Sequence, residues 1–222
     1  MRDAYDNLFK HIDKNNFFKT SLEDIIYIEP KKVQVQWNEL QKDIFENRII
    51  HIRGYGRDAK KTQYFITLYK HLFGNENVVK DSTNNAQPTK LIKCNTAFCK
   101  ITEDGKNGKE RIRNYQVSHL FGRTKNPLLF NCAWNIAYIP KYLDPFTGHE
   151  TQGDYSFEFK NLILPHLKNE FGEYIAEYNE IVQSKILGRL DAAIAEARKE
   201  LKINIKDFVR FEQDAKNELN II

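Results

Sequence analysis

The chain has 222 residues, of which 41% are hydrophobic and 29% charged, and a formal net charge of +4. This apolar content supports a globular core and excludes intrinsic disorder as the state of the whole chain. No stretch approaches the roughly 18 consecutive apolar residues of a membrane-spanning helix, and residues 1–13 are too polar for a signal peptide. The three cysteines are an odd number, which disfavours a disulfide framework. We therefore expect a cytoplasmic protein without a membrane partner.

The first 75 residues have the spacing of amphipathic helices. Apolar side chains recur at intervals of three and four residues in two groups, which predicts one helix around each group. Gly74 stands where a helix C-terminal cap favours glycine, and the polar run 80–88 (KDSTNNAQP) has the composition of a linker. We therefore place a boundary near residue 85. The two groups are Trp37, Leu40, Ile44 and Phe45, and Tyr64, Phe65, Leu68, Tyr69 and Leu72.

A short strand is expected between these helices, at residues 49–52, and a glycine turn follows it. The turn has the sequence Gly54-Tyr55-Gly56-Arg57, which could approach a phosphate group. It lacks the Gly-Lys-Ser/Thr sequence that completes a nucleotide-binding loop. An ordinary turn is therefore the better interpretation.

The middle of the chain predicts a β-hairpin. Residues 91–101 (LIKCNTAFCKI) and 111–121 (RIRNYQVSHLF) have strand character, and the polar, glycine-containing residues 103–109 separate them. An irregular loop then leads to helical patterns at 157–167 and 173–201. The last helix has an apolar face that would pack on the core or on a second copy of the protein. That face is formed by Ile181, Ile186, Leu187, Leu190, Ile194 and Leu201.

Basic side chains are concentrated between residues 85 and 130. This segment holds nine Lys and Arg against three Asp and Glu, whereas the rest of the chain is slightly acidic. A surface that follows nucleic-acid phosphates needs such a block, although a solvated lysine-rich hairpin has the same composition. The candidates for phosphate contacts are Lys109, Arg111, Arg113, Arg123 and Lys125.

The stretch that starts with the second predicted strand holds side chains suited to phosphodiester hydrolysis. His119 ends this strand, Asn131 and Asn135 lie in or just after the loop, and His149 precedes Glu150. An imidazole with a pKa of about 6.5 can deprotonate water at physiological pH. An asparagine oxygen and an imidazole nitrogen can hold a divalent metal that neutralises the scissile phosphate.

The order His119, Asn135, His149 resembles the His-Asn-His pattern of the HNH, or ββα-metal, nucleases. The resemblance implies an α+β fold with a core of β-hairpin, loop and helix, framed by N-terminal and C-terminal helices. It implies that His119 is the general base, that Asn135 orients this base or its loop, and that His149 ligates the metal. The implied metal is Mg²⁺, with Mn²⁺ as a possible substitute.

The resemblance covers residues 115–150 and departs from the family at one ligand. Ser118 stands where many members have an aspartate, so a water, Asn131 or Glu150 would complete the metal shell. With extra helices on both sides of its core, the chain resembles a type II restriction endonuclease that binds double-stranded DNA as a homodimer. The expected regions are a mostly helical part at 1–85, the nuclease core at 86–170 and a C-terminal helical part at 171–222.

Three other interpretations stay open. Asp144, Glu158 and Lys160 match the loose Asp…Glu-x-Lys pattern of the PD-(D/E)xK nucleases, in which two carboxylates hold the metal and a lysine assists the attacking water. A non-catalytic nucleic-acid-binding protein would use the basic segment for phosphate contacts and its histidines for structure. An interaction protein would pair its last helix with a partner.

The cysteines do not favour a structural zinc site. Cys94 and Cys99 are separated by four residues and no second pair follows, so a four-ligand site would have to recruit Cys132 or a histidine. Small buried hydrophobic residues are the better interpretation of all three thiols.

Overall fold

The computed structural model describes residues 3–100, 108–147 and 153–222 of the chain. Within this part helices alternate with short strands, which confirms the predicted α+β class. The α-helices are α1 (Ala4–Leu8), α2 (Lys14–Glu23), α3 (Pro30–Phe45), α4 (Thr62–Phe73), α5 (Ala86–Asn95), α6 (Pro127–Phe130), α7 (Asp154–Ile181), α8 (Gly188–Leu201) and α9 (Ile205–Glu218). The strands are β1 (Ile26–Tyr27), β2 (Ile50–Ile52), β3 (Val78–Lys80), β4 (Phe98–Lys100), β5 (Glu110–Ile112), β6 (Tyr115–His119) and β7 (Ile136–Pro140). Short helical turns of other types are η1 (Arg57–Ala59), η2 (Ala133–Asn135), η3 (Asp144–Thr147) and η4 (Val182–Leu187).

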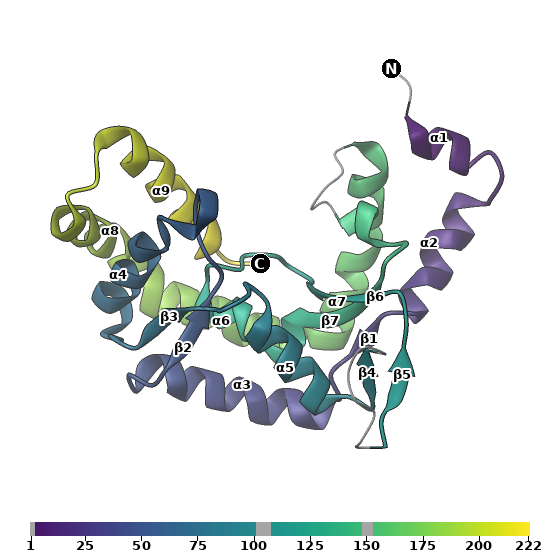
Figure 1. Cartoon of the computed structure of the whole chain (residues 1–222), viewed down its shortest axis with the longest axis horizontal. Coiled ribbons are helices and arrows are strands. Elements are labelled where there is room, and N and C mark those ends of the chain that lie inside the picture. Colours follow the sequence, from purple (N-terminus) through teal and green to yellow (C-terminus); the bar gives the residue numbers. More distant parts are fainter. Residues whose placement is uncertain (1–2, 101–107, 148–152) are drawn as a thin grey trace.

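Figure 1 shows two arms that rise from a common base. One arm contains α1, α2 and the first turns of α7, and the other contains α4, α8 and α9. Helix α3 crosses the base, and β6, β7 and α6 lie between the arms. One hydrophobic cluster includes Phe18 of α2, Ile112 of β5 and Phe211 of α9. The three predicted regions therefore share a core, and their boundaries stay predictions.

The two predicted N-terminal helices are α3 and α4, and both bury the expected apolar faces. Trp37 and Leu40 are buried in α3, and Leu68 and Leu72 are buried in α4. Gly74 caps α4 in the left-handed region with φ of 68°, as its position predicts. The expected strand at 49–52 is β2, which pairs in parallel with β3.

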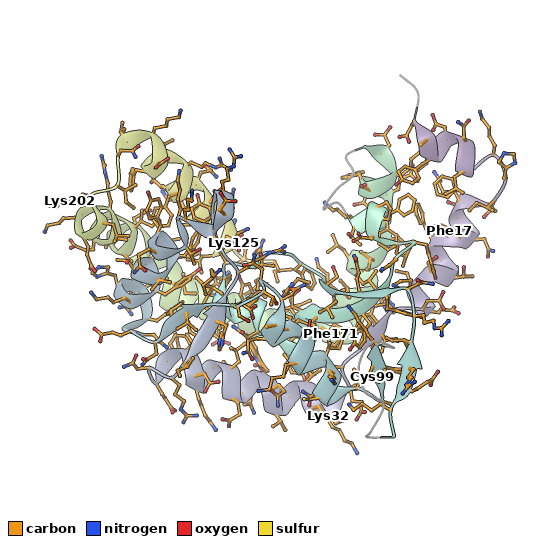
Figure 2. The ribbon with its side chains drawn as sticks, in the orientation of Figure 1. Phe17, Lys32, Cys99, Lys125, Phe171 and Lys202 are labelled. Atoms are coloured by element: carbon orange, nitrogen blue, oxygen red, sulfur yellow. The ribbon has the colours of Figure 1, made fainter. Side chains whose placement is uncertain are left out.

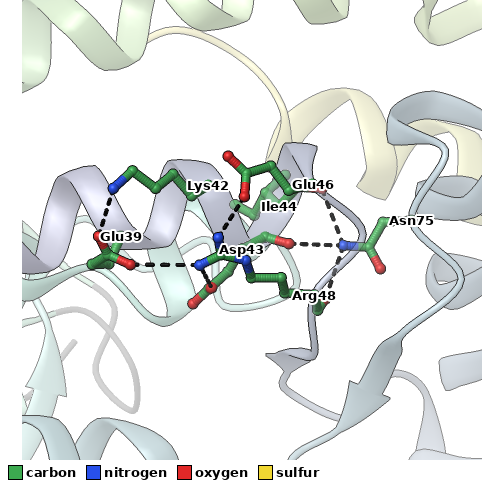
Figure 3. Close-up of polar contacts among 7 residues, drawn as sticks. All are labelled: Glu39, Lys42, Asp43, Ile44, Glu46, Arg48 and Asn75. Atoms are coloured by element: carbon green, nitrogen blue, oxygen red, sulfur yellow. Dashed lines mark hydrogen bonds and ion pairs between the residues drawn. The ribbon is translucent and has the colours of Figure 1, made fainter.

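Asn75, directly after this cap, ties the end of α3 to the start of β2 (Figure 3). Its Nδ2 donates to the carbonyl oxygens of Asp43, Ile44 and Arg48 at 3.1, 3.0 and 3.0 Å. Asn75 is 1% exposed, so these bonds satisfy buried carbonyls that the helix end leaves open. On the exposed side, Arg48 pairs with the carboxylates of Asp43 and Glu46. Hydrogen bonds on the buried side and ion pairs on the exposed side thus hold the connection from α3 into β2.

The predicted β-hairpin is wrong. Helix α5 occupies the first half of the first predicted strand, and β4 pairs with β5 in parallel, with Phe98 opposite Glu110. The fully buried carboxylate of Asp81 accepts hydrogen bonds at 2.8 Å from two backbone N–H groups of the first turn of α5. Such a cap satisfies donors that a helix start leaves unpaired, so the segment begins as a helix. The expected linker at 80–88 is therefore the β3–α5 connection.

The strand that ends at His119 is β6, and its partner is β7. The two strands are antiparallel, with His119 opposite Ile136 and Tyr115 opposite Pro140. Strand β1 pairs with the other side of β7, so β6 is an edge of this described sheet. The chain order from His119 onward is strand, loop, strand and helix, ending with α7.

The expected C-terminal helix at 173–201 is formed by the later part of α7, the π-helical segment η4 and α8. Helix α9 follows and packs Phe211 and Ala215 into the core. No helix within the described ranges is both long and apolar enough to cross a membrane.

Candidate active site

His119 is held at the end of β6 by contacts on its ring. Its Nε2 lies 3.0 Å from the carbonyl oxygen of Phe130, and its ring stacks on the Phe130 ring with centroids 5.2 Å apart. Because a carbonyl oxygen can only accept, Nε2 is the donor. The neutral form of the ring therefore carries its proton on Nε2.

Asn135 fixes the turn that follows His119. Its Oδ1 accepts from the N–H of Phe121 at 2.8 Å, and its Nδ2 donates to the carbonyl of Leu129 at 2.9 Å. Its own carbonyl accepts from the N–H of Leu120 at 2.8 Å. Asn135 is 0% exposed. These contacts make it a positioning residue for the loop rather than a group that reaches a substrate.

Two pockets meet at His119. The first, called the α7 pocket, has a volume of about 280 Å³ and lies between β6 and α7. The second, called the edge pocket, has a volume of about 370 Å³ and follows the edge of β6. The α7 pocket is lined by Ser118, His119, Leu120, Phe121, Gly122, Ile139, Thr147, Phe159, Lys160, Ile163 and Leu164. The edge pocket is lined by Arg53, Asn85, Gln116, Val117, Ser118, His119, Thr124 and Asp144.

The edge pocket places a cation and a carboxylate beside His119. Arg53 is exposed and directly follows β2, and its N–H donates to the carbonyl of Thr124 at 3.0 Å. Asp144 accepts a hydrogen bond from the amide of Gln116. A guanidinium can bind a phosphate through paired donors, and a carboxylate can bind a divalent metal. The pocket therefore combines an imidazole, a guanidinium and a carboxylate.

The oxygen atoms of the edge pocket fit a magnesium ion. Besides the Asp144 carboxylate, the pocket contains Asn85, whose buried Oδ1 accepts no hydrogen bond from the described part of the chain. Mg²⁺ prefers such hard oxygens, and it usually keeps several waters and one or two carboxylates. Within residues 3–100, 108–147 and 153–222, no group of three His, Cys, Asp or Glu side chains could hold a metal. Waters or phosphate oxygens would therefore complete the shell.

The structure describes one of the three predicted metal ligands, Asn131, and places it in a different pocket from the two that His119 lines. The Nδ2 of Asn131 donates to the carbonyl of His51 at 2.7 Å, and both residues line a separate pocket beside α3. His149 and Glu150 lie outside the described residues. Thr147, the last described residue before them, lines the α7 pocket.

Three of the five predicted phosphate contacts bind oxygens of the protein itself. The ammonium of Lys109 donates to carbonyls in and just after α5. Arg123 donates to two carbonyls that follow α9, and Lys125 pairs with a glutamate of α9 at 3.2 Å. Arg111 and Arg113 are exposed. The basic segment is therefore partly structural, which its charge count alone does not indicate.

The Asp…Glu-x-Lys pattern is spread over different places. Glu158 and Lys160 lie in α7, within the range where the sequence predicts a helix, and Glu158 pairs with Lys14 at 2.5 Å. Lys160 lines the α7 pocket, whereas Asp144 lines the edge pocket. Of the three residues, Asp144 is the one that lines the edge pocket together with His119.

The thiols differ in their surroundings. Cys99 and Cys132 are buried, whereas Cys94 is exposed on α5. Burial raises the pKa of the Cys132 thiol and keeps it neutral. The interpretation as buried hydrophobic residues is therefore correct for two of the three and wrong for Cys94.

The part of the chain that matches a known family includes the residues that line both pockets. A family model described as "Uncharacterised protein PM1201" matches residues 28–222. The uncharacterised protein PM1201 of Pasteurella multocida (strain Pm70) is 34% identical over 185 residues, which are 82% of this chain and 80% of that relative. No solved structure matches the chain. The chain belongs to the PM1201 family.

Proposed function

We propose that the chain is a metal-dependent endonuclease that hydrolyses phosphodiester bonds of double-stranded DNA, with His119 as its general base. The orientation of His119 carries the proposal: its Nε2 is bound by the Phe130 carbonyl, so Nδ1 would be the nitrogen that accepts the proton. Arg53 and Asp144 line the same pocket.

In this mechanism the scissile phosphodiester occupies the edge pocket. Nδ1 of His119 takes a proton from the water that attacks phosphorus, and the bond from phosphorus to the 3′ oxygen breaks. The Arg53 guanidinium binds the non-bridging oxygens and stabilises the charge that develops on them. Asp144 and Asn85 would hold the divalent ion, which when bound neutralises the phosphate and the leaving oxygen.

The substrate and assembly are extensions of the same proposal. Cutting at defined sequences by a homodimer, as in type II restriction endonucleases, rests on the resemblance of the His119 region together with the helices on both sides of it. The described residues contain no group that we assign to base recognition.

The direct test is incubation of purified protein with supercoiled and linear plasmid and Mg²⁺. We expect cleavage that EDTA abolishes and that added Mg²⁺ restores, because the leaving oxygen needs the metal. Discrete bands would support the sequence-specific form of the proposal, and a smear would limit it to a nonspecific nuclease. Intact DNA with Mg²⁺, Mn²⁺ and Ca²⁺ alike would overturn the nuclease proposal, and salt-dependent binding without cleavage would favour a non-catalytic binding protein.

The metal ligand can be tested separately with Asp144→Asn. Loss of the carboxylate charge weakens binding of a hard cation, so the Mg²⁺ concentration for half-maximal cleavage should rise at least about tenfold. Direct titration with Mn²⁺ should show the same weakening. The control is Glu158→Gln, which changes an exposed carboxylate paired with Lys14. An equal loss in both variants would favour the PD-(D/E)xK interpretation instead.

A further inference from the structure

A fourth pocket lies on the arm formed by α4, α8 and α9. It has a volume of about 810 Å³ between residues 54–61 and α9, and we call it the arm groove. Two residues that line it, Gly54 and Lys125, directly follow Arg53 and Thr124 of the edge pocket. Lys125 lies on the side of this arm that faces the other arm (Figure 2). The arm groove and the edge pocket are therefore neighbours, and one extended ligand can occupy both.

The arm groove is lined by five cationic and three acidic side chains. Each acidic side chain already has a partner within the protein, which is an ammonium group for two of them and the neutral Tyr55 hydroxyl for Asp214. The pairs are Asp207 with the Lys61 ammonium at 2.6 Å, Asp214 with the Tyr55 hydroxyl at 2.7 Å, and Glu218 with the Lys125 ammonium at 3.2 Å.

The remaining cations project into solvent. The Lys60 and Arg210 side chains are 79% and 81% exposed, and Arg57 is exposed as well. Lys60 and Arg210 have carboxylates at 3.9 and 3.7 Å. Exposed pairs contribute little to stability, because solvent screens them. These three cations are therefore available to an anionic ligand.

The turn that carries two of these cations is fixed by hydrogen bonds. Thr62 Oγ1 accepts from the N–H of Tyr55 at 2.9 Å and donates to the carbonyl of Ala59 at 2.6 Å. Ala59 has φ of 58°, a left-handed conformation that a non-glycine residue keeps only when its surroundings hold it. Tyr55 in turn anchors the turn to α9. Arg57 and Lys60 thus project from a defined backbone rather than from a free loop.

We propose that the arm groove binds the phosphate backbone of duplex DNA, beyond the bond that is cut in the edge pocket. Arg57, Lys60 and Arg210 would contact successive phosphates, and Arg53 would contact the scissile one. The identity of the polyanion rests on the proposed function. The contacts themselves are inferred from the neighbouring lining residues of the two pockets and from the exposed cations.

The test is equilibrium binding of a labelled DNA duplex, measured by fluorescence anisotropy without divalent ions so that no cleavage occurs. The double variant Arg57→Gln/Arg210→Gln should bind at least about tenfold more weakly at moderate salt. The slope of log K against log salt concentration should fall by about 2, because each lost phosphate contact removes about 0.9. The matched control is Lys31→Gln/Arg189→Gln, which also removes two exposed positive charges. Both residues lie outside the α7 pocket, the edge pocket and the arm groove.

The outcomes separate this inference from the proposed function. Unchanged affinity of the arm-groove variant, or an equal loss in the control, would overturn the inference even if the protein cleaves DNA. The expected loss in a protein that cuts no DNA would support the groove and overturn the nuclease. Tighter binding of an RNA duplex, with the same sensitivity to the substitutions, would overturn the assignment to DNA.

Discussion

Replacement of His119 by alanine is expected to slow Mg²⁺-dependent DNA cleavage by roughly 10²–10⁴-fold, the usual contribution of a general base. The substitution removes the Nδ1 atom that takes the proton and leaves Arg53 and the arm groove in place. DNA affinity should therefore stay within about twofold, since phosphate contacts dominate binding. Single-turnover plasmid cleavage and anisotropy measure the two effects separately.

The buried position of His119 calls for a folding control. Its ring packs on Phe130, so thermal melting of the variant must show that the fold persists at the assay temperature. His166→Ala removes another partly buried imidazole, which contacts Tyr27 with ring centroids 6.0 Å apart and lies outside both His119 pockets. That control should cleave DNA at close to the original rate. A folded His119→Ala protein that also does so would place the base elsewhere.

Asn135→Ala is expected to lower the free energy of unfolding by about 3 kcal/mol. The substitution leaves the N–H of Phe121 and the carbonyl of Leu129 without partners in a buried site, and each unpaired group costs about 1–3 kcal/mol. Urea denaturation measures the loss. The turn after His119 also loses its anchor, so cleavage should fall at temperatures where the variant is still folded.

The matched variant is Asn131→Ala, which removes an amide bonded to the His51 carbonyl in a different pocket. It should leave cleavage nearly unchanged. A loss of metal-dependent cleavage in this variant, with the fold intact, would support the predicted role of Asn131 as a metal ligand. A smaller effect of Asn135→Ala than of Asn131→Ala on cleavage would contradict the positioning role of Asn135.

The helices were more predictable than the strands for a physical reason. Helices α3 and α4 span 16 and 12 residues, which allows several repeats of the apolar spacing. The strands span two to five residues, too few to establish an alternating pattern. At residues 91–101 the ambiguity was resolved in favour of a helix by Asp81, which lies outside the segment. Helix α9 lies in the expected C-terminal helical part at 171–222 but was not predicted as a helix of its own, although Phe208, Phe211, Ala215 and Leu219 have helical spacing.

The candidate site could be predicted only where its residues lie close together in the sequence. His119 and Asn135 belong to one continuous segment, and their order suggested the family resemblance. Arg53 and Asn85 come from the preceding region and line the edge pocket together with His119. The residue after β2 is bonded to the loop after β6 through the Arg53 N–H and the Thr124 carbonyl. No pattern in the local sequence indicates such long-range packing. The charge pattern likewise shows how many cations the segment has, and not which ones bind the protein itself.

The segment 218–221 braces the loop that follows His119. The Glu218 carboxylate accepts from the N–H groups of Lys125 and Asn126 at 2.9 and 3.2 Å, and two carbonyls after α9 accept from Arg123. These contacts join positions 92 to 98 residues apart. During synthesis on the ribosome, the loop beside the proposed base can therefore form these bonds only after α9 and the residues after it have emerged. A nascent or prematurely terminated chain lacks this brace, so the proposed DNA cleavage would depend on synthesis having passed that point.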